Sequence, residues 1–194
     1  MYKKILFAMI SLVLLISLTG CREPIELEFA VTETGFPLGF TRMSDGAQIN
    51  LGMHRSEIES ILGESGDTSR VMAEYGAIVG TYGRSEDGDS GFIDIRYTPE
   101  GKAVSIGLFL PNWAVSGGFS LGDNIHDLLD SIRLKGLTYG FADSTGRVID
   151  DIENPTRFFI FFECFDEEGK IVGMDISHIP IVVNGSFVDW RGID

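Results

Sequence analysis

The sequence predicts an α+β fold made of two tandem helix-plus-antiparallel-sheet repeats, with the helices on one face of the sheet. Residues 49–63 return in a weaker form at residues 119–133, and a Glu-Gly-Lys turn recurs at residues 100–102 and 168–170. Helix and hairpin therefore recur in the same order after about seventy residues, which is typical of an internal duplication. The predicted units are a signal peptide (1–20), a tether with an N-terminal strand (21–48), a first α/β repeat (49–112) and a second α/β repeat with a C-terminal hairpin (113–194).

The first repeat opens with a turn at Leu51-Gly52 and a short helix over residues 55–62. Ile58 and Leu62 lie four residues apart on one helical face, and Gly63 stands where a helix ends. Either His54 or Ser56 caps the start of the helix. In the second repeat Leu121-Gly122 forms the turn, and Asn124 is the expected cap with Asp127 three residues later.

Runs of alternating apolar and polar residues predict the strands. Gly-rich and Pro-rich segments separate them, and residues 111–118 form the joint between the repeats. Asn184-Gly185 predicts a type I′ turn within a hairpin over residues 181–188. The expected strands cover residues 25–31, 75–83, 92–97, 102–110, 137–141, 157–165 and 170–177.

The N-terminal segment has the composition of a secretory signal. Lys3 and Lys4 precede an almost wholly apolar run over residues 5–18, which is shorter than the roughly twenty residues of a spanning helix. Leu18-Thr19-Gly20-Cys21 follows and resembles the lipobox of bacterial lipoproteins. The resemblance implies that Cys21 becomes the first residue after cleavage, carries diacylglycerol and anchors the protein in a cell membrane or outer membrane.

The charge balance excludes several classes of partner. The chain has 29 acidic and 15 basic residues and a net charge of −14, and the acidic residues all follow Cys21. Nucleic acids and anionic lipid surfaces bind clustered Lys and Arg, so we expect neither as a partner. With Cys21 lipidated, Cys164 has no internal partner for a disulfide, and its apolar surroundings predict a buried, inert thiol.

No motif indicates catalysis, so we expect neither an enzyme nor a cofactor. The sequence contains no Gly-x-Ser-x-Gly, no phosphate-binding glycine loop and no distinct pair of opposed carboxylates. His54, His126 and His178 lack the spacing of zinc ligands, so no metal site is expected. Residues 86–91 form the segment most similar to a calcium loop, but they lack the EF-hand pattern, which favours a solvated loop.

Gly52-Met53 with Glu57-Ile58 and Leu62-Gly63 resembles the helix head of two related groups. These are the tandem beta-lactamase-inhibitor-protein-like domains and the small outer-membrane assembly lipoproteins. The resemblance covers residues 49–178 and implies a helical layer on an antiparallel sheet that binds proteins. The second copy has Asp123 in place of Met53 and lacks the closing glycine, and the inhibitor's paired cysteines are missing, so beta-lactamase inhibition does not carry over.

These features predict a lipid-anchored extracytoplasmic module that binds a protein or has a structural role in the envelope. The aromatic content exceeds the needs of one core face, and a sheet covered on one side leaves its other face for a partner or for the terminal strands. An inhibitor of an extracellular enzyme and a secreted hydrolase with an unfamiliar carboxylate site are the alternatives. The expected partner-binding residues are Phe109, Trp113, Phe159, Phe161 and Trp190.

Overall fold

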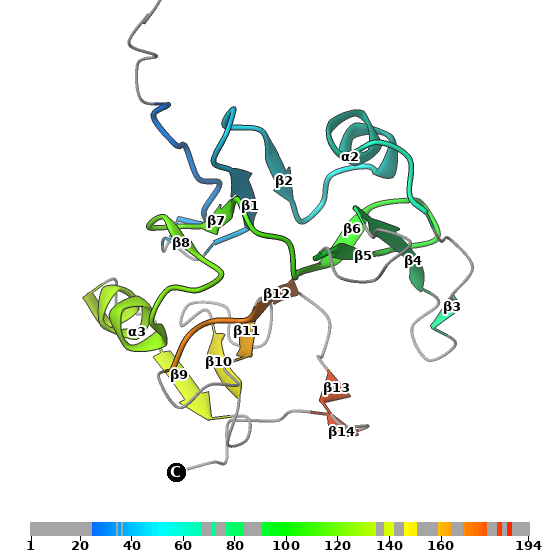
Figure 1. The fold of residues 1–194 in the computed structure, drawn as a ribbon. Coiled ribbons are helices and arrows are strands. Elements are labelled where there is room, and N and C mark those ends of the chain that lie inside the picture. Colours follow the sequence, from blue (N-terminus) through cyan, green and yellow to red (C-terminus); the bar gives the residue numbers. More distant parts are fainter. Residues whose placement is uncertain are drawn as a thin grey trace, which may run out of the picture.

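The protein is a mixed helix and sheet structure dominated by antiparallel strands (Figure 1). The residues that the structure describes form a four-stranded sheet, an eight-stranded sheet, a short hairpin and helices α2 and α3. Among these described residues, no helix is long and apolar enough to cross a membrane. The computed structural model describes residues 25–33, 35, 37–66, 71–72, 77–83, 91–134, 138–141, 146–150, 159–163, 169–177, 182–183 and 186–187.

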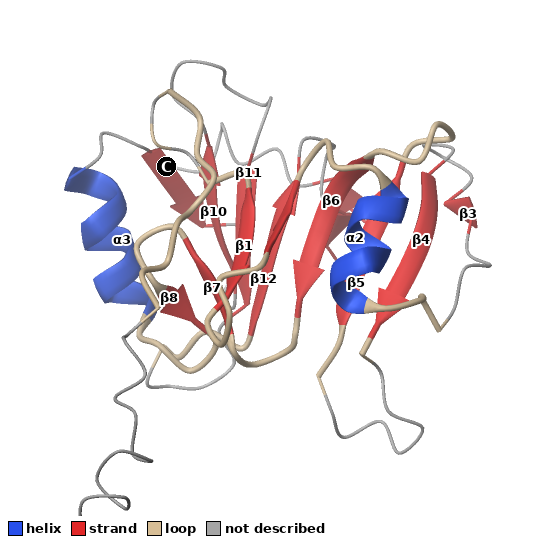
Figure 2. Ribbon diagram, turned by 90° about the horizontal axis from the view of Figure 1, so that it is seen from above, coloured by secondary structure: helices blue, strands red, loops and turns tan. Residues whose placement is uncertain are grey.

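The eight-stranded sheet consists of two antiparallel meanders that meet at the centre (Figure 2). One meander runs outward from β6 and the other from β12, and these two strands pair with each other. At this seam Ile106 is opposite Ile176, and Gly107 is opposite Asp175. The strand order is β3 (Val71–Met72), β4 (Ala77–Tyr82), β5 (Ile93–Tyr97), β6 (Ala103–Leu108), β12 (Gly173–Ser177), β11 (Phe159–Glu163), β10 (Gly146–Asp150) and β9 (Thr138–Phe141).

The four-stranded sheet and both helices lie on one side of the eight-stranded sheet (Figure 1). Its central strands, β1 and β7, come from distant parts of the chain and pair antiparallel. The strand order is β2 (Gln48–Asn50), β1 (Gly39–Arg42), β7 (Trp113–Val115) and β8 (Phe119–Ser120). The remaining elements are α2 (Arg55–Leu62), α3 (Ile125–Leu134) and the hairpin of β13 (Val182–Val183) and β14 (Ser186–Phe187).

Helix α2 has the boundaries that the sequence predicts. Its N-cap is His54, whose Nδ1 accepts a hydrogen bond from the Ser56 amide at 3.3 Å. The Glu57 carboxylate accepts from the His54 amide at 2.7 Å and completes a capping box. Gly63 ends the helix with a φ of 88°, a positive value that glycine adopts without strain.

Helix α3 begins in a similar way. The side-chain oxygen of Asn124 accepts a hydrogen bond from the His126 amide at 2.8 Å, which confirms the predicted cap. Both helix heads are also joined to the eight-stranded sheet by corresponding backbone hydrogen bonds. These bonds run from Gly52 N to Ala103 O (2.8 Å), Ala103 N to Met53 O (2.9 Å) and Arg55 N to Gly101 O (2.8 Å), and from Gly122 N to Ile171 O (2.7 Å), Ile171 N to Asp123 O (2.9 Å) and Ile125 N to Gly169 O (2.9 Å).

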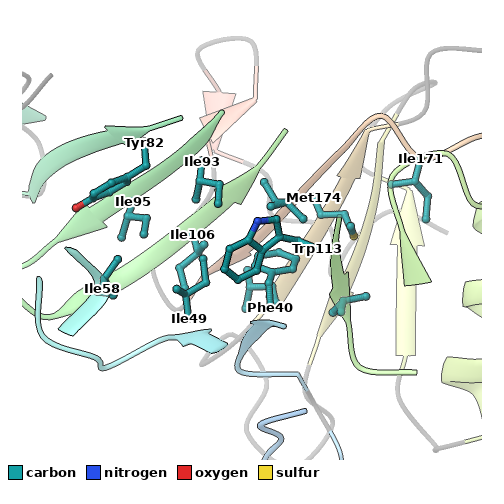
Figure 3. Close-up of a cluster of buried hydrophobic side chains, with 14 of the residues drawn as sticks. Phe40, Ile49, Ile58, Tyr82, Ile93, Ile95, Ile106, Trp113, Ile171 and Met174 are labelled. Carbon is teal, nitrogen blue, oxygen red and sulfur yellow. The ribbon is translucent and has the colours of Figure 1, made fainter. Parts of the chain in front are cut away.

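The hydrophobic core lies between the two sheets and under α2 (Figure 3). Phe40 and Ile49 extend from the four-stranded sheet, and Ile106 and Met174 from the eight-stranded sheet. Ile58 is the residue of α2 that is completely buried, as its apolar helix face predicts. Trp113 lies between the sheets next to Phe40 (Figure 3).

The predicted strands of both meanders are confirmed at β4, β5, β6, β9, β11 and β12. The predicted strand over residues 25–31 is wrong, because this segment makes only an isolated bridge between Val31 and Pro37. Proline has no amide hydrogen with which to continue a ladder. The segment is instead held at the Glu28 carbonyl, which accepts hydrogen bonds from the side chains of Thr41 (2.7 Å) and Gln48 (2.9 Å).

Candidate functional site

A cavity of about 290 Å³ lies where α2, the two sheets and the β6–β7 connection meet. The end of β1 and its following turn form one side, and the last residue of α2 forms another. Tyr82 at the end of β4 and Ile93 at the start of β5 border the cavity on a further side. The lining residues are Arg42, Ser44, Leu62, Tyr82, Gly83, Ile93, Leu110, Pro111, Asn112 and Trp113.

The inner wall of the cavity is made of side chains that belong to the core. Trp113, Tyr82 and Ile93 border the cavity but are only 2%, 1% and 0% exposed, so almost none of their surface is accessible from it. The Tyr82 hydroxyl hydrogen-bonds to the Tyr97 hydroxyl at 2.6 Å. Burial raises the Tyr82 pKa above its usual value of 10.0, so the ring stays neutral at physiological pH.

Arg42 is the cation at the cavity, and its charge is paired within the protein. Its guanidinium donates to both Asp45 carboxylate oxygens, at 2.9 Å from Nε and 2.7 Å from Nη2. Nη1 donates to the Ile61 carbonyl at 3.3 Å, and the guanidinium carbon lies 5.4 Å from the centre of the Trp113 ring. The hydrogen bond from Arg42 lowers the pKa of Asp45 to about 2, so this pair remains ionised over the physiological range.

The β6–β7 connection shapes the rim of the cavity. Asn112 has a φ of 70°, the only positive φ of a non-glycine residue in the part of the chain that the structure describes. Its carbonyl accepts a hydrogen bond from the Met43 amide at 2.8 Å, which joins the connection to the turn after β1. Asparagine tolerates this left-handed conformation better than most residues, so the turn positions Pro111 and Asn112 at the surface with little strain.

The structure corrects the expected role of Trp113. The sequence places Trp113 in a Pro-Asn-Trp joint, where an exposed aromatic ring is a plausible partner contact. Instead, Trp113 pairs with Arg42 through β7 and β1, and its ring is 2% exposed between the sheets. It is therefore a core residue that borders the cavity, and it is not available at the surface in this conformation.

The other predicted contact residues lie elsewhere. Phe109 is half-buried and stacks on Phe92, with ring centres 4.9 Å apart. Because Leu108 faces the core, the next residue, Phe109, lies on the opposite face of the sheet. Phe159 pairs with Ser177 and Phe161 with Asp175 through the β11–β12 register. Cys21 and Trp190 lie outside the described residues.

Two carboxylates flank the seam on the face of the eight-stranded sheet opposite the helices. Gly107 pairs with Asp94 on one side and Asp175 on the other, and a side chain at this position would begin only 3.3 Å from the Asp175 Oδ2 atom. Ser105 donates to Asp175 at 2.8 Å, and Thr81 donates to Asp94 at 2.6 Å. Burial, with a smaller contribution from Asp94, raises the pKa of Asp175 above its usual value. Neither carboxylate lines the cavity.

The histidines that the structure describes have no ligand arrangement. His54 caps α2, and His126 is exposed at the start of α3. Within the described ranges no three His, Cys, Asp or Glu side chains are grouped closely enough to hold a metal ion. His178 and the acidic residues 86–90 lie outside those ranges.

Sequence reasoning did not identify Arg42, Ser44 and Asn112 as neighbours at one site. They come from a turn and from a connection about seventy residues later, and no local pattern predicts that these segments meet. The sequence did predict that residues 111–118, which include Pro111 and Asn112, form a joint between the repeats.

The described elements form a mixed helix and sheet protein with two large antiparallel sheets. No family profile matches the chain, and no curated protein does either. It is similar to the crystal structure of an extracellular protein containing an SCP domain from Bacillus anthracis str. Ames, with a TM-score of 0.45 and 12% sequence identity. The alignment covers 66% of this chain and 43% of the other chain. A similarity this low assigns neither a common fold nor a function.

Proposed function

We propose that the protein is a lipid-anchored, extracytoplasmic and non-catalytic module that binds a protein partner or has a structural role in the envelope. One observation carries this proposal, namely the basic start, the apolar run and the Leu18-Thr19-Gly20-Cys21 sequence at the N-terminus. Cleavage before Cys21 and lipidation of its thiol would attach the folded part through a tether. The net charge of −14 favours this covalent anchor over electrostatic adhesion to anionic lipid.

We propose further that the chain consists of two copies of one scaffold joined side by side. The matching backbone hydrogen bonds at the two helix heads support this arrangement, as do Gly52 and Gly122, which have φ values of 84° and 92°. The central pairs, β6 with β12 and β1 with β7, also fit two units that associate through equivalent strands.

The proposed partner surface is the face of the eight-stranded sheet opposite the helices. The stacked pair of Phe92 and Phe109 supports this choice, because half-buried aromatic side chains are frequent at protein interfaces. Phe159 and Phe161 fall in the same rows as Ser177 and Asp175, but Ser177 is 0% exposed, so the choice of this face rests on its Phe92–Phe109 end. Burial removes Trp113 from this surface.

The anchor is tested by metabolic labelling and fractionation in the native host. The wild type is expected to incorporate labelled palmitate and to sediment with membranes, whereas Cys21→Ala loses the label and accumulates uncleaved. Cys164→Ala is the matched control, because it removes the other cysteine of the chain and keeps the Leu-Thr-Gly-Cys sequence. Retention of the palmitate label in Cys21→Ala, or its loss in Cys164→Ala, contradicts the proposal.

The partner surface is tested separately by site-specific crosslinking in the same host. A photoreactive residue at Phe109 is expected to capture one discrete partner, and the same residue at exposed Ser60 on α2 is the control. Equal capture from both positions contradicts the assignment of the binding face, whatever the outcome for the anchor.

A further inference from the structure

We propose that the outer side of the four-stranded sheet lies against the lipid bilayer, with Ile25 and Met43 in contact with its polar interface. The outer side is the side turned away from the eight-stranded sheet. This orientation rests on the lipid anchor proposed above at Cys21, and it adds which side of the folded part meets the membrane. It is based on the placement of the N-terminal segment (residues 25–31), its short connection to Cys21 and the position of exposed apolar side chains.

The N-terminal segment crosses the outer side of the four-stranded sheet. Phe40 faces the core, so the next residue of β1, Thr41, faces outward. Thr41 is nevertheless only 1% exposed, and its hydroxyl donates to the Glu28 carbonyl at 2.7 Å. The Gln48 side chain of β2 donates to the same carbonyl at 2.9 Å. These contacts hold the described N-terminal end, drawn in blue, on the side of the four-stranded sheet and the helices (Figure 1).

Ile25 is only four residues from the proposed anchor. An extended chain spans at most about 3.3–3.6 Å per residue, so Ile25 lies within about 14 Å of Cys21. Ile25 also borders the turn after β1, because a Cβ atom at Gly46 would lie 3.6 Å from Ile25 Cγ2. A domain of about 170 residues has a radius of gyration of about 15 Å and is therefore roughly 40 Å across. The short connection holds this end near the bilayer and keeps the far face of the eight-stranded sheet away from it.

Exposed apolar side chains are concentrated at the same end. Among the described residues, the exposed large hydrophobic side chains are Val31 (42%), Ile25 (41%), Met43 (37%) and Val172 (37%). The first two belong to the N-terminal segment, and Met43 lies in the turn that Ile25 borders. Apolar side chains that are held near an anchor gain free energy by entering the interfacial region of a bilayer, which favours this end as the membrane contact.

Charge disfavours the helices as the membrane contact. The exposed residues of α2 include Glu57, and those of α3 include Asp127 and Asp130. An anionic lipid surface repels these carboxylates. The turn after β1 differs, because Arg42 donates to both oxygens of Asp45, at 2.9 and 2.7 Å, and the two charges cancel.

The contact does not require anionic lipid. Glu26 and Glu28 are exposed on the N-terminal segment, so the described residues at this end have no excess of positive charge that would attract phosphate groups. The anchor supplies the proximity instead, because it raises the effective concentration of Ile25 and Met43 at the interface.

This orientation leaves the proposed partner surface open to the aqueous side. Phe92 and Phe109 stack on the face of the eight-stranded sheet opposite the four-stranded sheet. With the four-stranded sheet against the bilayer, this face points away from the membrane. A partner can therefore reach Phe109 without competing with lipid.

Site-specific crosslinking to phospholipid tests the orientation in the full chain in its native host. A photoreactive aliphatic residue replaces Met43, Val172 or Phe109, one position at a time, in cells labelled with ³²P-phosphate. Met43 and Val172 are matched, because each is 37% exposed, and Val172 directly precedes β12. After irradiation and extraction of unbound lipid, the Met43 variant is expected to carry at least tenfold more ³²P-phospholipid than the other two. The diacylglycerol on Cys21 adds no background, because it contains no phosphate.

A longer tether tests the role of the short connection. A twelve-residue Gly-Ser segment is inserted between Pro24 and Ile25, which keeps the Leu-Thr-Gly-Cys sequence and the described residues unchanged. The sixteen residues after Cys21 then span about 20–24 Å on average, and the folded part is free to turn. The ³²P signal at Met43 is expected to fall at least threefold, while the palmitate label stays the same.

The palmitate label separates failure of the orientation from failure of the anchor. If palmitate is incorporated but Met43 and Val172 capture equal ³²P, or Phe109 captures the most, the orientation is wrong and the anchor stands. If no variant incorporates palmitate, both the anchor and the orientation are wrong. An unchanged Met43 signal with the longer tether contradicts the proposal that the short connection holds this side against the bilayer.

Discussion

Replacing Ile106 with alanine perturbs the seam that joins the two meanders of the eight-stranded sheet. Ile106 is 0% exposed and lies on β6, opposite Ile176 on one side and Ile95 on the other. The substitution keeps the backbone ladder and removes side-chain contacts between segments about seventy residues apart. Its effect on the free energy of unfolding therefore measures how much this seam contributes to stability.

The expected loss follows from the carbons that are removed. Isoleucine has three more side-chain carbons than alanine, and each buried methylene contributes about 0.8 kcal/mol, which gives a transfer contribution of about 2.4 kcal/mol. Incomplete collapse of the resulting cavity adds to this value, so Ile106→Ala is expected to lower the free energy of unfolding by about 2–5 kcal/mol. Ile176→Ala removes the facing side chain, which is also 0% exposed, and is expected to fall in the same range.

Urea unfolding followed by circular dichroism measures both variants and the double variant. Because the two side chains are direct partners, their effects should be non-additive by about 0.5–3 kcal/mol. Ile25→Ala is the control with the same chemistry, since Ile25 is 41% exposed and should change stability by less than about 1 kcal/mol. A loss at Ile106 no larger than that at Ile25, or strictly additive effects at the seam, would refute the reasoning.

Three further substitutions test local features of the structure. Asp175→Asn should make the free energy of unfolding less dependent on pH. The pKa of Asp175 is raised in the folded state above its usual value of 3.8. The wild type should therefore lose stability relative to the variant as the pH rises from about 3.8 through the folded-state pKa. Urea unfolding from pH 3 to 8 measures this difference, and a difference that does not change with pH contradicts it. His54→Ala removes the α2 cap and should lower the free energy of unfolding by about 1 kcal/mol, whereas His126→Ala, at an exposed position, should stay within about 0.5 kcal/mol. Gly101→Ala forces alanine into a φ of 82° with its Cβ 3.0 Å from the His54 ring, and should lower the thermal midpoint in line with a loss of about 1–2 kcal/mol. Gly66→Ala is the control with space for the methyl group, and an equal loss there would contradict the conformational explanation.

Features that depend on neighbouring residues were predictable from the sequence. The ends of α2 follow from its capping residue and from Gly63, and the Asn124 cap of α3 follows from its side-chain chemistry. Strands β4, β5, β6, β9, β11 and β12 of the two meanders were predicted from their apolar residues, whereas β3 and β10 were not. The N-terminal strand was wrong although its alternation is equally regular, because a strand also needs a pairing partner, and this segment makes only the bridge between Val31 and Pro37 and one adjoining bond from Leu38 N to Ala30 O.

The candidate site was predictable only in part. The joint at residues 111–118 was predicted from the sequence. The orientation of Trp113 was not, because an indole ring suits a buried core and an exposed contact equally well. The position of Arg42 was not predictable either, because it depends on the pairing of β1 with β7. This pairing positions the guanidinium carbon 5.4 Å from the centre of the Trp113 ring.

The sequence by itself determined the local elements of this protein, its acidic charge and the lipobox-like Leu18-Thr19-Gly20-Cys21 segment, because each depends on residues that are close together in the chain or on simple composition. The tertiary structure decided which strands meet at the centre of each sheet, which side of the joint Trp113 faces and where the cavity forms. These outcomes depend on the register between distant segments, and local sequence patterns do not determine that register.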